Sequence, residues 1–156
     1  MRFEYFQMID RIVALDVEAR SVRSLCRVPR QSTIFENHFP TYPLMPGVLQ
    51  IECMAQTAGW LVMAVSGFAA MPFLAGVKDA KFRQAVMPGD ELEFEGLLVH
   101  EGSGFAVCEC KGRRQGKTIC EAQIFYRVVS FPTPEFRTAI LERAEEIELT
   151  VKEFSK

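Results

Sequence analysis

Two side chains in the first half of the sequence, His38 and Glu52, have the chemistry of a proton-transfer pair. His38 is one of only two histidines, and imidazole gains and loses a proton near neutral pH, which suits a general base. Glu52 stands among apolar residues, where a carboxylate is costly to bury unless it is paired, protonated or used. Taken singly, each has an ordinary alternative: a surface histidine, and a hydrogen-bonded buried glutamate. The surrounding sequence therefore decides between these interpretations.

The residues that follow His38 are typical of a stiff loop. Prolines recur at positions 40, 43 and 46, and each fixes its own φ and biases the preceding residue towards an extended conformation. We expect a structured loop over residues 32–47, because a loop constrained in this way can hold a side chain in a fixed place.

A helix is predicted to follow directly, over residues 48–66. Pro46 and Gly47 suit its start, and its apolar residues lie nearly all round the axis, which indicates burial on most faces. Gln56 comes four residues after Glu52, so the two side chains share one helix face. The amide of Gln56 can therefore orient the carboxyl group of Glu52.

The same region raises the question of a membrane span. Residues 53–77 carry no charge, and a run of this length could cross a bilayer. Polar residues, three glycines and a proline within the run make it a poor lipid-facing helix. We therefore expect a buried core helix and no transmembrane segment.

Strands dominate the rest of the chain. They are expected near residues 11–16 and 18–28, and after the helix over 73–82, 91–100, 105–112 and 118–129. A capping threonine and a proline at 133 and 134 begin a C-terminal helix over about 134–149. One buried helix and an antiparallel sheet that can wrap around it predict an α+β fold with a single domain over residues 1–156.

Composition limits the classes of function. The formal net charge of −2 gives no general attraction to nucleic acid or to anionic lipid. The five cysteines are an odd number, and none forms a CxxC pair with which a zinc site could begin. The charged N-terminus lacks the apolar run of a signal peptide. We expect free, buried thiols in a reducing, cytoplasmic compartment, without a metal and without a nucleic-acid partner.

A longer sequence pattern contains both His38 and Glu52. From His38 the chain reads HFP–x–x–P–x–MPGVL–x–x–E–x–MAQ, which closely resembles the signature of the bacterial 3-hydroxyacyl-[acyl-carrier-protein] dehydratases, including the spacing of histidine and glutamate. The later segment FLAGVKDAKFRQAVMPGD, residues 73–90, is similar to the same family. Such a spaced match, over roughly residues 34–90, is far more specific than a short motif.

The resemblance implies a hotdog fold, a sheet wrapped round the central helix, with active sites at a dimer interface. His38 of one subunit would be the general base, and Glu52 of the partner subunit the general acid. The backbone N–H of Gly47 would bind the thioester carbonyl, and Gln56 would orient the acid. The implied assembly is a homodimer or a trimer of dimers.

The implied reaction is the dehydration of 3-hydroxyacyl thioesters on acyl carrier protein to trans-2-enoyl thioesters, in fatty acid biosynthesis and without a cofactor. The helix N-terminus and Glu52 suit this chemistry. A helix N-terminus directs N–H groups at the oxygen that becomes negative when the C2 proton leaves. Desolvation of Glu52 among apolar groups would favour its protonated form, which can donate to the departing 3-hydroxyl group.

An acyl chain also requires an apolar tunnel, and an acidic carrier protein requires a basic surface. Candidate tunnel residues are the large apolar side chains of the loop, the helix and the next strand: Phe39, Leu44, Met45, Trp60 and Phe73. Candidate docking residues are the cations of that strand: Lys78, Lys81 and Arg83. Ordinary core packing is the alternative for the first set, and a solvated strand face for the second.

The chain departs from the family in two places. Thr41 stands where the family has a loop glycine, and threonine fits poorly if that position requires a positive φ. The family's N-terminal segment is absent except for a likeness over residues 9–12. The EYFQMID start and the AAMPFL run are similar to a subgroup associated with very-long-chain acyl groups, so a specialised role in lipid A biosynthesis is one prediction.

Three other functions are compatible with a hotdog fold. An acyl thioesterase would use a carboxylate to activate water. A dehydratase that also isomerises the double bond typically has Asp where Glu52 stands. A non-catalytic partner subunit would require neither His38 nor Glu52, so the presence of both favours simple dehydration. The preferred chain length and the choice between dimer and hexamer are left open.

Overall fold

The computed structural model describes residues 1–150. A 3₁₀ turn at Phe3–Tyr5 precedes strand β1. The remaining elements follow in chain order: β1 (Arg11–Asp16), β2 (Ser21–Arg27), α1 (Thr33–Asn37), α2 (Gly47–Val65), β3 (Ala70–Phe82), β4 (Glu91–Gly102), β5 (Phe105–Arg114), β6 (Lys117–Ser130) and α3 (Pro134–Glu146).

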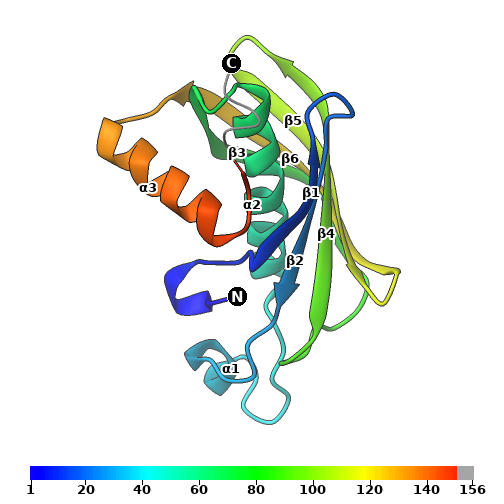
Figure 1. Cartoon of the computed structure of the whole chain (residues 1–156). Coiled ribbons are helices and arrows are strands. Elements are labelled where there is room, and N and C mark those ends of the chain that lie inside the picture. The colour runs from blue at the N-terminus through cyan, green and yellow to red at the C-terminus, as the bar shows by residue number, and fades with distance from the viewer. Residues whose placement is uncertain (151–156) are drawn as a thin grey trace.

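The strands form one six-stranded sheet in the order β1-β2-β4-β5-β6-β3, and every neighbouring pair is antiparallel. The sheet curves around α2, while α3 lies on the side of α2 that faces away from β2 and β4 (Figure 1). This is the hotdog arrangement of the α+β class, so the expected fold is confirmed.

The helix and the sheet approach each other closely because small residues face one another. A Cβ atom on Gly96 of β4 would lie only 3.1 Å from Val22 and 3.2 Å from the Cβ atom of Ala58 on α2. Nearby, the buried hydroxyl groups of Ser24 and Thr57 hydrogen-bond at 2.7 Å, which satisfies both in an apolar setting. These contacts fix the rotation of α2 and therefore the direction in which its polar side chains point.

The cysteines belong to this core. All five are buried and free, as expected from the sequence. Burial raises the pKa of Cys108 to about 12, so its thiol stays protonated and unreactive at neutral pH. The thiols therefore act as small apolar side chains.

Three local features differ from the sequence expectations. A short helix, α1, lies inside the expected loop, because Ser32 caps it by accepting the N–H of Ile34. Strand β2 begins at Ser21 rather than near residue 18, since a turn held by the Ala19 N–H and Asp16 Oδ1 precedes it. The C-terminal helix ends at Glu146 rather than near 149, where the chain turns through a residue with positive φ.

Helix α2 is long and apolar enough to cross a membrane by length and composition alone. In the fold, 72% of its apolar window is buried between the sheet and the N- and C-terminal segments. This burial agrees with the core helix expected from the sequence.

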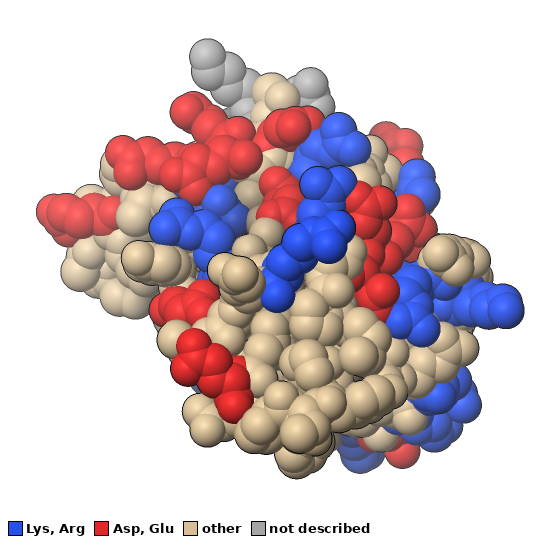
Figure 2. All heavy atoms as spheres, turned by 90° about the horizontal axis from the view of Figure 1, so that it is seen from below, with Lys and Arg blue, Asp and Glu red and all other residues tan. Residues whose placement is uncertain are grey.

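The surface has mixed charge and one long apolar edge. Charged side chains of both signs lie next to one another on the face in Figure 2, beside a broad uncharged area. Strand β3 is an edge strand, and its exposed apolar residues are Phe73, Leu74, Val77 and Phe82. An exposed apolar strand edge is a surface on which another chain can pair.

Candidate active site

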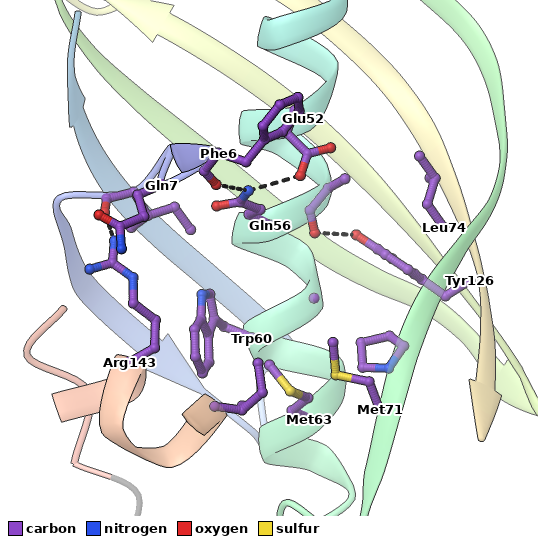
Figure 3. A pocket seen from close by; sticks show the side chains of 15 residues that line it. Phe6, Gln7, Glu52, Gln56, Trp60, Met63, Met71, Leu74, Tyr126 and Arg143 are labelled. Carbon is purple, nitrogen blue, oxygen red and sulfur yellow. Dashed lines mark hydrogen bonds between the residues drawn. The ribbon is translucent and has the colours of Figure 1, made fainter. Parts of the chain in front are cut away.

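A pocket of about 440 Å³ opens beside the middle of α2. Glu52 and Gln56 border it from α2, and Trp60 and Met63 continue its wall along the same helix (Figure 3). Strands β3 and β6 close another side through residues such as Met71 and Tyr126, and the N-terminal segment and α3 supply the rest. The pocket is thus a mainly apolar space with one carboxyl group at its border.

The carboxyl group of Glu52 has a fixed orientation. Gln56 Nε2 donates to Glu52 Oε1 at 2.8 Å, as expected from their spacing, and to the backbone oxygen of Phe6 at 2.7 Å. Gln56 Oε1 accepts the N–H of Met8 at 3.2 Å. Because the amide of Gln56 is held at both ends, it cannot rotate freely, and it sets the position of the acid. Within residues 1–150 the other oxygen of Glu52 has no hydrogen-bond partner, and it is available to a bound molecule.

His38 stands at the C-terminal end of α1, half-buried, with its ring stacked on that of Phe39. Its Nδ1 atom lies 3.3 Å from the carbonyl oxygen of Leu44. A carbonyl oxygen can only accept, so Nδ1 carries the proton of the neutral ring and Nε2 keeps its lone pair. Nε2 is therefore the ring nitrogen that can accept a proton.

The position of α1 depends on the N-terminal segment. Glu4 accepts hydrogen bonds from the hydroxyl group of Ser32 at 2.8 Å and the backbone N–H of Thr33 at 3.1 Å. Hydrogen bonding to its own backbone N–H, and then to Ser32 and Thr33, lowers the pKa of Glu4. The segment that holds Gln56 therefore also holds α1, the helix that directly precedes His38.

The loop from His38 reaches α2 without strain at Thr41. The N–H of Met45 donates to the oxygen of Val86 at 2.8 Å, which fixes the loop just before the helix begins. Thr41 is not among the described residues with positive φ, so its difference from glycine causes no left-handed strain. Gly47 is the first residue of α2, and a Cβ atom there would lie 3.2 Å from the ring of Phe82.

The structure brings together some of the predicted site residues and separates others. Glu52, Gln56 and Trp60 line one pocket. His38, Gly47 and the other four proposed tunnel residues do not line it in a single chain. Among these four, Met45 is buried in the core, Leu44 is partly buried, and Phe39 and Phe73 are exposed.

The three predicted docking cations are all exposed; Lys78 and Lys81 lie on β3, and Arg83 directly follows it. Arg83 and Lys81 both pair with Glu121 of β6, at 2.6 and 3.6 Å. Lys78 lies 5.9 Å from the centre of the Phe125 ring. Two of the cations are therefore partly neutralised by a neighbour on the same sheet.

Several pocket residues were not predicted from the sequence. Tyr126 is buried on β6, and its hydroxyl group donates to the oxygen of Ala55 at 2.7 Å. Phe6, Ile140 and Arg143 come from the two ends of the chain. The apolar stripe of the C-terminal helix was visible in the sequence, but nothing local indicated that it would cover α2.

Fold and pocket together define a class: a hotdog-fold protein with an oriented carboxyl group beside an apolar pocket on its central helix. The chain belongs to the FabA-like family, whose model matches residues 2–123. The chain is 31% identical, over 128 residues, to the 3-hydroxyacyl-[acyl-carrier-protein] dehydratases FabZ of Listeria welshimeri and Listeria monocytogenes. Each match covers 81% of this chain and 88% of the relative.

Solved structures with the same fold include proteins described in other ways. A hypothetical thioesterase with coenzyme A from Streptococcus pneumoniae has a TM-score of 0.61 at 17% identity, covering 79% of this chain and 88% of that one. A conserved protein from Pseudomonas aeruginosa has a TM-score of 0.63 at 19% identity, covering 81% and 91%. At these identities the likeness establishes the fold only.

Proposed function

We propose that the protein dehydrates 3-hydroxyacyl thioesters carried on acyl carrier protein, giving trans-2-enoyl thioesters in fatty acid biosynthesis. The observation that carries this proposal is the carboxyl group of Glu52, oriented by Gln56 at the border of an apolar pocket. The FabZ relatives carry the name of this activity. The reaction places a polar centre, C2 and C3 of the substrate, next to an alkyl chain, and the pocket has the same two parts.

In the proposed mechanism, Nε2 of His38 removes a proton from C2 while negative charge develops on the thioester oxygen. The N–H of Gly47, at the start of α2, stabilises that charge. Protonated Glu52 donates to the 3-hydroxyl group, the C3–O bond breaks, the C2=C3 double bond forms, and water leaves. His38 then releases its added proton to solvent and Glu52 takes up one proton, which restores the base and the acid.

The active unit in this proposal is a homodimer, alone or within a trimer of dimers. His38 does not line the pocket of Glu52 in one chain, and the exposed apolar edge of β3 offers a surface for a second copy. The arrangement that we propose has His38 of one subunit beside Glu52 of the partner subunit. The acidic carrier protein would dock on Lys78, Lys81 and Arg83, and the reaction would take place in the cytoplasm. Lipid A synthesis is the specialised pathway that we propose.

Thioester hydrolysis is the second candidate, because a structural neighbour is described as a hypothetical thioesterase. A carboxylate on the central helix could activate water instead of protonating a leaving group. The nitrogen Nε2 of His38, left free by the Nδ1 contact to Leu44, favours the base–acid pair of a dehydratase.

One assay separates the two candidates. The purified chain is incubated with 3-hydroxydecanoyl-acyl carrier protein, while enoyl product is followed by mass spectrometry and free thiol by a colorimetric reagent. We expect enoyl product without thiol release, and its loss in His38→Ala and in Glu52→Gln. Thiol release without enoyl product would replace this proposal with the thioesterase, and a cis-3 product would indicate an isomerising enzyme.

A further inference from the structure

Helix α3 lies beyond the part of the chain that matches the family, yet it forms part of the pocket wall. The family match ends at residue 123, and α3 begins at Pro134. Ile140 and Arg143 of α3 nonetheless line the same pocket as Glu52. This wall is therefore contributed by a segment outside the family match.

Helix α3 is attached to the core near both ends. Arg137 Nε donates to the backbone oxygen of Phe68 at 3.1 Å, near its start, and Arg143 donates to the oxygen of Ile9 at 2.7 Å, near its end. Just after the helix, the oxygen of Ile147 accepts the N–H of Ile12 at 2.9 Å. Hydrogen bonds to the segment between α2 and β3 and to the N-terminal part of the chain make α3 a fixed wall.

The wall lies at the end of the pocket that is remote from the carboxyl group. In Figure 3, α3 lies on the side of Trp60 and Met63, whereas Glu52 lies further along α2, away from α3. Glu52 and Met63 are three helical turns apart, about 16 Å along the axis at the usual rise per residue. An alkyl chain that started at Glu52 and followed α2 would therefore run towards α3.

The chemistry at that end suits an alkyl terminus. Trp60, Met63, Met71 and Ile140 supply apolar surface there. The guanidinium group of Arg143 is not free, because it donates to the oxygen of Ile9 and to the carboxylate of Glu146. Its aliphatic part can therefore line the pocket while its charge is compensated elsewhere.

We infer that α3 is the end wall of the acyl pocket, and that Ile140 sets the length of acyl chain that the pocket accepts. This inference rests on the proposed function for the identity of the occupant, an acyl thioester. A bulkier residue at 140 shortens the pocket and rejects long chains, while leaving room for short ones. A smaller residue lengthens it.

The test uses Trp60, the only tryptophan of the chain, as a probe inside the pocket. Full-length wild type, Ile140→Phe and Ile140→Ala are titrated with hexadecanoyl-coenzyme A and butanoyl-coenzyme A while Trp60 fluorescence is recorded. Neither saturated thioester can be dehydrated, so binding is measured without the proposed reaction. Leu141→Phe and Leu141→Ala are matched controls, because Leu141 is the next residue, is equally half-buried and does not line the pocket.

We expect Ile140→Phe to weaken binding of hexadecanoyl-coenzyme A about tenfold with butanoyl-coenzyme A unchanged, as overpacking costs of this kind predict. Ile140→Ala keeps or strengthens long-chain binding, and the Leu141 controls bind as wild type does. Equal effects on both thioesters, equal effects of the two positions, or no response of Trp60 in wild type would overturn the inference. If the variants show this chain-length pattern but the wild type forms no enoyl product, only the proposed dehydration is refuted.

Discussion

Gln56 Nε2 lies 2.8 Å from Glu52 Oε1 and 2.7 Å from the backbone oxygen of Phe6, so one amide joins the central helix to the N-terminal segment. Its oxygen accepts the N–H of Met8, which removes the alternative orientation of the amide. The acid is therefore positioned by a chain of contacts that begins outside its own helix.

Replacing Gln56 with Leu is expected to lower kcat about tenfold, because a lost hydrogen bond of about 1.4 kcal/mol at the acid becomes a tenfold change in rate. The substrate KM is expected to change less, since Gln56 acts through Glu52. Steady-state kinetics on 3-hydroxydecanoyl-acyl carrier protein measure both. Gln84→Leu, at an exposed position, is the control, and equal effects of the two changes would contradict a positioning role.

Gly47→Ala tests the start of the helix. The new Cβ atom would lie 3.2 Å from the Phe82 ring, so either the ring or the first turn of α2 must shift. We expect a loss of roughly 1 kcal/mol in unfolding free energy and a clear fall in kcat. Urea unfolding and kinetics provide the measurements. Gly102→Ala, where a Cβ atom meets nothing within 4 Å, should leave both unchanged. If Gly47→Ala/Phe82→Ala is no more stable than Gly47→Ala, the steric explanation is wrong.

Tyr126→Phe removes the buried hydrogen bond to the oxygen of Ala55. The expected cost is about 1–2 kcal/mol of unfolding free energy, because a buried backbone oxygen loses a partner. Chemical denaturation measures it, with Tyr5→Phe as an exposed control that should have no effect. An unchanged stability in Tyr126→Phe would show that this bond does not hold α2 on β6.

The same residue predicts a dependence on alkaline pH. Burial raises the pKa of Tyr126 well above its ordinary value of 10.0. The unfolded chain therefore releases this proton first, and the stability that Tyr126 contributes is present below pH 10 and falls as the pH rises beyond it. Tyr126→Phe should show a shallower loss of unfolding free energy above pH 10 than wild type. Parallel pH profiles of the two proteins would exclude Tyr126 as the cause.

Val77→Asp tests the edge of β3 as the dimer interface. A charge on this exposed apolar edge would be buried in a dimer, so we expect monomers and loss of activity, with little change in the fold of one chain. Sedimentation velocity measures the mass in solution. Val99→Asp, also exposed but on β4, is the control and should leave the assembly intact. A dimeric Val77→Asp protein would place the interface elsewhere.

The sequence predicted what depends on local spacing. The i, i+4 relation of Glu52 and Gln56 follows from helix geometry, and the alternation of the strands follows from the pleat. Contacts between residues far apart in the chain could not be predicted in this way. The hydrogen bond between Phe6 and Gln56 joins positions 50 residues apart, and neither residue type requires the other.

The tunnel prediction illustrates the same limit. Trp60 lies on α2, where the helical period determines which face it shares with Glu52, and it does line the pocket. Phe39 lies in a loop, where no period relates one side chain to another, and it is exposed in one chain. The wall that α3 provides depends on tertiary packing alone, because its apolar stripe could have covered any face of the molecule.

The most direct test of the account mixes two inactive proteins, His38→Ala and Glu52→Gln, by co-expression with different tags. If His38 of one subunit acts with Glu52 of the partner subunit, each mixed dimer contains one intact site and one doubly altered site. Random pairing then predicts that the unfractionated mixture recovers about a quarter of wild-type dehydration, because a symmetric dimer has two equivalent sites. Purified mixed dimers without activity, beside an active wild type, would contradict the shared site.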